Sequence, residues 1–340
     1  MVSFGWKAAT EQYSPEDLLE HTVLAEKAGI DSVWASDHFL PWADTGAHCA
    51  FAWVWLASAA EKTKNMIVGT GVTAPILRYH PAIVAQAFAT LGRMYPGRVR
   101  LGLATGEPMN EMPLGYDWPR PKERIDRLEE AVMIIRMLWE QDWVTHRGKY
   151  YHLREAKLYT KPKRPVPIYM AAFTPEVANL VGKYADGYYT FLGKPIEFYK
   201  DTLFPAVKKG ASQAGKDFKE MGSAIEMLFS FDEDKDKALA SARFWKATLS
   251  PAITKHAVYD PREIQENGRK VGDETMEKTW VITTDPQDII KRAGECFRAG
   301  FKQVVFMSSS PNQRKAIGML GKEVVPHLRQ EFADDLRNRP

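Results

Sequence analysis

Several features that mark specialised proteins are scarce in this 340-residue sequence. It has two cysteines, Cys49 and Cys296, which are too few and too far apart for a disulfide framework or a cysteine zinc site. We expect both to be free thiols. No apolar run approaches the roughly 20 residues of a membrane span, and the first ten residues lack the apolar core of a signal peptide. These absences predict a cytoplasmic protein that does not enter a membrane.

An excess of charge of one sign is also missing. The 46 basic residues are balanced by 43 acidic ones, which leaves a formal net charge of +3, and no block of the sequence is strongly basic. Nucleic acid is therefore not expected as a partner. With 45% hydrophobic and 26% charged residues, the composition is that of a globular protein of one large domain or two small ones.

What the sequence does contain is a regular alternation of short apolar runs and longer amphipathic ones. Helix starts such as Ser14-Pro15 and Thr174-Pro175 follow the apolar runs, each with a hydroxyl cap and a proline in the first turn. We predict helices that include 48–62 and 196–214, and eight strands at about 2–8, 31–35, 66–72, 98–104, 166–172, 187–191, 223–229 and 303–307.

Eight strands that alternate with helices predict a (β/α)8 TIM barrel in which residues 1–340 form a single domain. Residues 141–164 and 235–280 interrupt the alternation, and we interpret them as insertions without a barrel strand. The main alternative is an open doubly wound sheet. Such a sheet usually has a glycine-rich first turn, and Ala8 to Glu11 contains no glycine.

Residues able to do chemistry follow several of the predicted strands, whose carboxyl ends meet at one face of such a barrel. Asp37-His38 ends the second strand, and a histidine beside a carboxylate can exchange a proton near neutral pH. An isolated pair of this kind is more often only hydrogen-bonded within its loop. The other strand ends favour a functional site, because they supply Glu11, Gly71-Val72, Thr105-Gly106-Glu107 and Lys194.

The stretch after the fourth strand contains a second candidate acid, Glu107. The glycine before it lets the backbone approach a ligand closely, so we predict a functional role for Glu107. For Glu111 we predict helix capping. His38, Asp37 and Glu107 are all possible metal ligands, but the sequence lacks the spacing of a histidine-rich site, and we expect no metal.

A set of motifs is distributed over nearly the whole chain. It comprises Gln12, Ser36-Asp37-His38-Phe39-x-Pro41-Trp42, Arg78-Tyr79-His80-Pro81-Ala82, Ala85-Gln86-Ala87-Phe88-Ala89-Thr90, Tyr95-Pro96, Thr105-Gly106-Glu107-x-x-Asn110-Glu111 and Arg243-Phe244-Trp245. With these motifs the sequence resembles the coenzyme F420-dependent dehydrogenases of the bacterial-luciferase-like superfamily. Two branches are similar to it, the glucose-6-phosphate dehydrogenases and the secondary-alcohol dehydrogenases.

The resemblance implies a role for each matching residue at the barrel mouth. Asp37 would contact the deazaflavin, and His38 would take the proton of the substrate hydroxyl. Trp42 would support the charge that develops beside it. Glu107 would supply a proton to the deazaflavin ring as a hydride reaches C5, with Glu11 as a further carboxylate. The family also implies a small-molecule substrate and a homodimer.

Other positions would line the cofactor. The family often bends its backbone at the position of Gly71-Val72 through a non-proline cis peptide bond. Further cofactor positions are Thr105, Gly106 and Asn110, together with three places where this chain departs from the family pattern, namely Ala74, Phe173 and Thr174.

The substrate positions divide the two branches. The sugar-phosphate branch holds its phosphate with two lysines and an arginine, which correspond here to Lys194, Lys255 and Thr279. Loss of the arginine removes a planar fork that binds phosphate with two hydrogen bonds. Phe191 replaces a sugar-contacting threonine and makes the pocket more apolar. We favour a sugar 6-phosphate as the substrate, with a secondary alcohol as the alternative. An FMN-dependent monooxygenase and a non-catalytic protein that binds a deazaflavin or a flavin are the other hypotheses.

Overall fold

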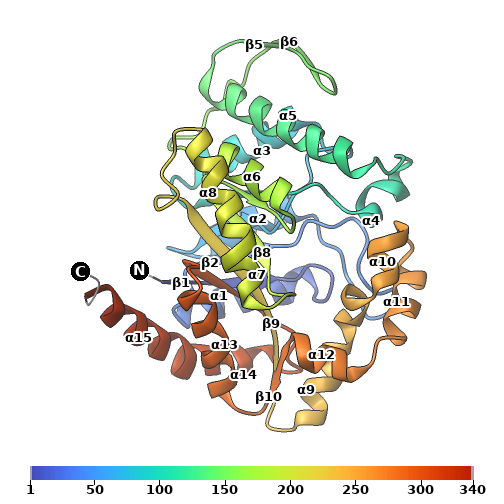
Figure 1. Ribbon diagram of the computed structural model, residues 1–340, viewed down its shortest axis with the longest axis vertical. Coiled ribbons are helices and arrows are strands. Elements are labelled where there is room, and N and C mark those ends of the chain that lie inside the picture. Colours follow the sequence, from blue (N-terminus) through green and yellow to red (C-terminus); the bar gives the residue numbers. More distant parts are fainter. Residues whose placement is uncertain (1, 338–340) are drawn as a thin grey trace.

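Eight parallel strands close into a barrel in the computed structural model, which describes residues 2–337 without the side chains of residues 254, 255 and 334–337 (Figure 1). The closing contact pairs β8 with β9, and β11 returns to β1. The predicted (β/α)8 barrel is confirmed. Its strands are β1 (Ser3–Ala8), β2 (Ser32–Ala35), β3 (Ile67–Thr70), β4 (Val99–Leu103), β7 (Ile168–Ala171), β8 (Gly187–Phe191), β9 (Gly222–Phe231) and β11 (Gln303–Ser308).

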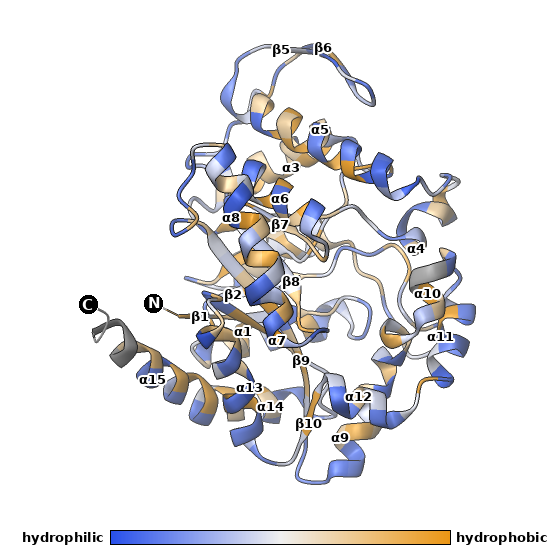
Figure 2. Ribbon diagram, in the orientation of Figure 1, coloured by the Kyte–Doolittle hydropathy of each residue, from blue (hydrophilic) through white to orange (hydrophobic). Residues whose placement is uncertain are grey.

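The helices that cover the barrel begin where the sequence supplies caps. The Ser14 hydroxyl accepts the Asp17 N–H at 3.1 Å, and the Thr174 hydroxyl accepts the Val177 N–H at 3.4 Å, as their positions before proline predicted. Figure 2 shows hydrophobic and hydrophilic residues on different sides of helices such as α5 and α13. The covering helices are α1 (Pro15–Lys27), α2 (Ala52–Lys62), α3 (Pro81–Met94), α5 (Pro121–Glu140), α6 (Pro175–Tyr184), α8 (Phe204–Gln213), α13 (Pro286–Arg298), α14 (Gln313–Met319) and α15 (Val325–Arg337).

Two predicted helices have different limits in the structure. The first, predicted over 48–62, begins only at Ala52, because Phe51 at its cap is extended and has no side-chain hydrogen bond to offer the helix. The second, predicted over 196–214, is interrupted by a π-helical turn over Tyr199–Leu203, with the short α7 (Ile196–Phe198) before it and α8 after it.

The barrel interior is filled by aromatic and small side chains. Trp34 lies 5.0 Å from Tyr189 and 5.2 Å from Tyr169, measured between ring centroids. Nearer the carboxyl ends of the strands lies a buried ion pair of Lys7 and Glu226, 2.7 Å apart. The Lys7 ammonium also donates to the carbonyl oxygen of Gly71. The interior beneath the strand ends is therefore packed with side chains. Lys7, the one buried lysine among the described side chains, donates to the loop after β3.

The structure contains three strands that the sequence did not predict. Residues 141–164 include an antiparallel hairpin of β5 (Val144–Arg147) and β6 (His152–Ala156), and a short strand β10 (Val281–Thr283) pairs with the end of β9 outside the barrel. The hairpin is fastened by Glu130, whose carboxylate accepts the N–H groups of Tyr150 and Tyr151 at 3.1 and 3.0 Å. Such contacts with the preceding helix α5 leave no periodic pattern in the sequence of the strands themselves.

The second interruption is helical as predicted, with α9 (Lys235–Ala242), α10 (Pro251–His256), α11 (Pro261–Arg269) and α12 (Asp273–Thr279). Both cysteines are free thiols. Over the described residues, no helix is long and apolar enough to cross a membrane.

Candidate active site

The side chains of Glu11, His38 and Glu107 come from three separate strand ends, and both carboxylates lie close to one nitrogen of the imidazole. His38, after β2, places Nε2 3.4 Å from Oε1 of Glu11 and 3.2 Å from Oε2 of Glu107. Glu11 follows β1 and its side chain is 3% exposed, whereas that of Glu107, after β4, is 43% exposed. The other ring nitrogen, Nδ1, is buried without a hydrogen-bond partner among the described residues. The arrangement can move a proton between an imidazole and either of two carboxylates.

Trp42 stands beside this histidine and links it to the helical insertion. Its ring centroid is 5.9 Å from that of His38. Trp42 packs on a cluster that contains Trp245 and Trp280, and the indole N–H of Trp245 donates to Gln12 at 2.8 Å. The insertion therefore builds one wall of the site through aromatic packing, because indole rings bury a large area with fixed geometry.

Asp37 is held by more partners than the sequence suggested. Its carboxylate accepts the hydroxyls of Thr73 at 2.5 Å and Tyr79 at 3.1 Å. The Arg78 guanidinium donates both to the Asp37 carboxylate at 3.2 Å and to its backbone carbonyl at 2.5 Å. Since His38 is the next residue, these hydrogen bonds fix the backbone that carries the imidazole. Arg78 and Tyr79 were visible only as part of a motif, since nothing in their spacing shows that they reach Asp37.

The prediction that Glu111 caps a helix is wrong. Glu111, the last residue of α4 (Pro108–Glu111), precedes the 3₁₀ turn Met112–Leu114, and its side chain makes no capping hydrogen bond to that turn. The Glu111 carboxylate instead accepts the backbone N–H of Arg78 at 2.8 Å. Its Oε1 is 3.6 Å from Nε of the Arg78 guanidinium. One buried cation thus lies between two buried carboxylates, Asp37 and Glu111. Burial raises the pKa of Glu111 from 4.5 to about 7, against the opposing effect of Arg78.

This raised pKa predicts a pH-dependent stability. Folded protein keeps a proton on Glu111 that unfolded protein releases above pH 4.5, so the free energy of unfolding falls as pH rises towards 7. Glu111→Gln is neutral at every pH and avoids this loss. We expect the variant to gain on the order of 2 kcal/mol over wild type between about pH 5 and about pH 8, measured by urea denaturation. Glu140→Gln, at an exposed position, is the control. Parallel profiles for wild type and Glu111→Gln would contradict the prediction.

The candidate cofactor positions lie on neighbouring loops of the same face. The Gly71–Val72 peptide bond is cis, the conformation that the resemblance implied at this position. Gly106, beside Thr105, has φ +77°, and a Cβ there would meet the Cβ of Ala74 at 3.1 Å, so only glycine lets these two loops approach so closely. Asn110 is buried and accepts the backbone N–H of Phe39 at 2.8 Å.

The two remaining cofactor positions and Phe191 form an aromatic rim. Phe173, after β7, and Phe191, at the end of β8, have ring centroids 4.9 Å apart and are each about half exposed. Thr174, next to Phe173, is occupied as the cap of α6. Exposed phenyl rings at a strand end offer a flat apolar surface to a ligand.

The candidate phosphate ligands Lys194 and Thr279 share no hydrogen bond or ion pair among the interactions of the described residues. Lys194 is exposed in the loop after β8. Thr279 donates its hydroxyl to the Thr275 carbonyl of its own helix at 2.8 Å. Lys255 belongs to α10, and its side chain lies outside the described residues. Within the described part of the chain, no group of three or more His, Cys, Asp and Glu side chains is placed to hold a metal ion.

A protein-family model and known proteins match nearly the whole chain. Residues 2–303 match the model of the luciferase-like monooxygenase family. An F420-dependent glucose-6-phosphate dehydrogenase of Microbacterium testaceum (strain StLB037) is 41% identical over 98% of this chain and 99% of its own length. Relatives of this kind cover the insertions as well as the barrel.

Solved structures show the same architecture. An F420-dependent secondary alcohol dehydrogenase in complex with an F420-acetone adduct superposes with a TM-score of 0.93 at 41% identity, covering 96% of this chain and 99% of that one. A coenzyme F420-dependent tetrahydromethanopterin reductase of Methanopyrus kandleri has a TM-score of 0.78 at 25% identity, with coverages of 96% and 99%. Sugar-phosphate and alcohol enzymes are thus equally similar in sequence, and the barrel of luciferase-like type is confirmed.

Proposed function

The chain belongs to the luciferase-like monooxygenase family, and from that premise we propose that it is an F420-dependent dehydrogenase that oxidises a hydroxyl of a sugar 6-phosphate. The observation that carries the proposal is the imidazole of His38 between the carboxylates of Glu11 and Glu107. Removal of a hydroxyl proton and delivery of another proton require such a set at one place.

The residues at the barrel mouth fit a deazaflavin. The half-exposed rings of Phe173 and Phe191 suit a flat aromatic ligand. The close approach of Gly106 to Ala74 leaves backbone rather than side chain on the surface there. The buried Nδ1 of His38, which lacks a protein partner, is a polar atom that a ligand in the site would satisfy. When bound, the cofactor accepts a hydride at C5 and a proton on its ring.

The chain's own residues handle the protons. His38 takes the proton of the substrate hydroxyl, and Trp42 beside it covers the imidazole from water. Glu107 holds the proton that is delivered at the mouth, 3.2 Å from Nε2 of His38. Glu11 is nearly buried and offers a fixed negative charge to the imidazole when it is protonated. Arg78 keeps Asp37, and with it His38, in place.

A secondary alcohol is the second candidate substrate. The observation in its favour is the aromatic rim together with Thr279, whose hydroxyl donates to its own helix and offers a phosphate no planar fork. Lysines can still bind phosphate as point charges, so we favour a sugar phosphate over a secondary alcohol as the substrate.

An assay of two variants separates the substrates. If Lys194 and Lys255 bind phosphate, Lys255→Ala should raise KM for glucose 6-phosphate about ten- to a hundredfold and leave isopropanol unaffected. Thr279→Arg should lower that KM, because it adds a planar fork. Steady-state rates with F420 and each substrate provide the measurement. Turnover of isopropanol alone, unchanged by Lys255→Ala, would assign the enzyme to the alcohol branch.

We also propose that the chain acts as one catalytic domain in the cytoplasm and assembles as a homodimer. Support for the dimer comes from apolar side chains on α2 and α3, the helices after the adjacent strands β2 and β3. Val54, Ile83 and Met94 are 67%, 52% and 57% exposed. Large apolar side chains that are exposed to solvent favour a protein contact.

Charge placed on these helices should break the dimer. For Val54→Asp with Ile83→Asp we expect half the wild-type mass in size-exclusion chromatography with light scattering, since a buried unpaired carboxylate opposes association. Met133→Asp, at an exposed apolar residue of α5, is the control and should keep the wild-type mass. A dimeric double variant would exclude this face as the interface.

A further inference from the structure

The loop after β3 contacts Asp37 at both of its ends. At its start, Thr73 donates its hydroxyl to the Asp37 carboxylate at 2.5 Å. At its end, Arg78 donates to the same carboxylate at 3.2 Å and Tyr79 donates to it at 3.1 Å. The Asp37 side chain is 1% exposed. Because His38 follows Asp37 in the chain, the position of the imidazole depends on how residues 73–79 are held.

The middle of this loop is held by Tyr151, a residue of the first insertion. Its hydroxyl lies 3.0 Å from the carbonyl oxygen of Pro75 and 2.9 Å from that of Ile76, and it shares its single proton between them. Tyr151 is buried, and its ring meets that of His80 edge-on at a centroid distance of 5.6 Å. A buried carbonyl group is costly to leave without a donor, so this hydroxyl fixes the middle of the loop.

Tyr151 lies in the turn between β5 and β6, which Glu130 of α5 anchors. Figure 1 shows this hairpin beyond α5, at the edge of the molecule. The Glu130 carboxylate accepts the Tyr151 N–H at 3.0 Å, and its Oε1 lies 3.0 Å from Nε2 of His146. A Cβ on Gly148 would lie 1.7 Å from the same oxygen, so the turn packs closely around the carboxylate. The hairpin therefore connects a covering helix to the loop that holds Asp37.

We propose that Tyr151 is a positioning residue for the proton transfer by His38, and that it acts through residues 73–79 and Asp37. The inference rests on the proposed function, because it takes His38 as the group that accepts the hydroxyl proton. A general base must lie within hydrogen-bonding reach of the proton that it removes, and a small displacement of the base lowers the rate of the chemical step. The hairpin contributes to the reaction in this way although it lies outside the barrel.

NMR of protein with labelled histidine follows the imidazole without substrate or cofactor. The Trp42 ring, 5.9 Å from that of His38, gives the His38 ring protons a chemical shift that changes when either ring moves. Tyr151→Phe removes the hydroxyl and keeps the ring. We expect this variant to move the His38 resonance, which is assigned from its loss in His38→Ala. It should also lower kcat about three- to tenfold while the KM for the substrate stays unchanged.

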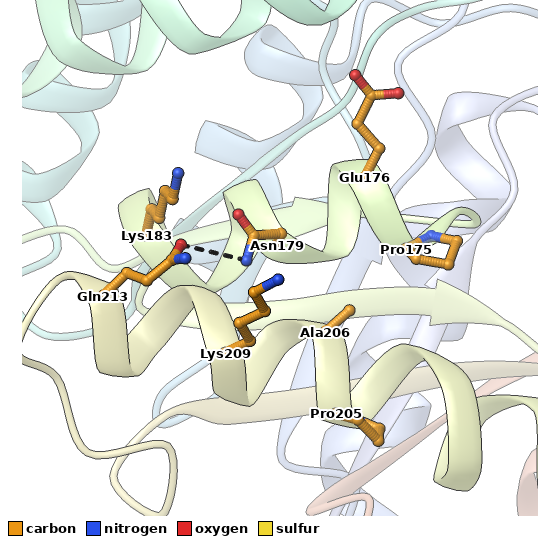
Figure 3. Close-up of a pocket in the computed structure, with 8 residues that line it drawn as sticks. All are labelled: Pro175, Glu176, Asn179, Lys183, Pro205, Ala206, Lys209 and Gln213. Atoms are coloured by element: carbon orange, nitrogen blue, oxygen red, sulfur yellow. Dashed lines mark hydrogen bonds between the residues drawn. The ribbon is translucent and has the colours of Figure 1, made fainter.

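Tyr184→Phe is the matched control. Tyr184 is the last residue of α6, which packs against α8 on the outside of the barrel (Figure 3), and its hydroxyl donates to Glu129 of α5 at 2.7 Å. This variant also loses a hydroxyl hydrogen bond, and it should keep the wild-type His38 resonance and kcat. Glu130→Gln keeps the side-chain volume but loses one acceptor oxygen, so it should move the His38 resonance in the same direction as Tyr151→Phe.

The outcomes separate this inference from the proposed function. An unmoved His38 resonance in Tyr151→Phe or Glu130→Gln, or a wild-type kcat in Tyr151→Phe, would overturn the inference and leave the proposed function standing. Equal changes in Tyr184→Phe would show a general loss of packing and would also overturn it. If wild type reduced F420 with neither glucose 6-phosphate nor isopropanol, the proposed function would fall, and with it the catalytic role of Tyr151.

Discussion

Replacement of His38 by alanine is expected to lower kcat by about 10²- to 10⁴-fold while the dissociation constant of F420 stays within a few-fold of wild type. The effect on kcat is large because Nε2 of His38 is the only imidazole nitrogen that the described structure places between Glu11 and Glu107. The effect on binding is small because the proposed cofactor contacts come from other residues, namely Asp37 and the loops of Gly71-Val72 and Thr105-Gly106.

Stopped-flow reduction of F420 and equilibrium titration, performed on the same preparation, separate the two quantities. His152→Ala, at an exposed position of the β5–β6 hairpin, is the control for histidine loss and should behave as wild type. The assignment would be reversed by two results together. These are a loss of cofactor affinity of tenfold or more in His38→Ala, which is about 1.4 kcal/mol of binding free energy, and normal turnover of this variant at saturating F420.

The sequence could predict the barrel and the position of its catalytic face for a physical reason. Parallel strands covered on both faces appear as short apolar runs, and their carboxyl ends must converge once the barrel closes. Glu11, His38 and Glu107 are far apart in the chain, yet each directly follows a predicted strand. The structure places the carboxylates of Glu11 and Glu107 at 3.4 and 3.2 Å from Nε2 of His38.

The contacts that support the site could not be read in the same way. The hydrogen bonds from Arg78 to Asp37 and the burial of Glu111 depend on how three loops pack against one another. A polar residue in a loop looks the same in sequence whether it is solvated or buried, so capping was the interpretation for Glu111. Lys7 in an apolar strand was the available signal for an interior ion pair, since a lysine is rarely buried without a partner.

The two carboxylates beside His38 differ in how far their side chains are exposed to solvent. Glu107 is accessible at the mouth, where 43% of its side chain is exposed, while Glu11 is 3% exposed behind the imidazole. A group that delivers protons must be able to reach both the ligand and water, and Glu107 alone has that access. A fixed charge beside an imidazole needs no access, and Glu11 suits that role.

Glu107→Gln is therefore expected to reduce the rate of F420 reduction by about 10²-fold or more, with the dissociation constants of F420 and substrate little changed. Glutamine keeps the size and the hydrogen bonds of the side chain but cannot deliver a proton. Glu11→Gln is the matched comparison, because it removes the charge from the other neighbour of the same nitrogen. Its rate should fall less, since it loses only electrostatic support for the protonated imidazole.

Single-turnover rates for wild type and both variants, from about pH 5 to about pH 9, provide the measurement. We expect Glu107→Gln to be slower than Glu11→Gln over the whole of this range, because Glu107 is the acid with access to both the ligand and water. A Glu107→Gln enzyme with wild-type rates across this range would remove Glu107 from the mechanism, and a larger loss for Glu11→Gln would exchange the roles of the two acids.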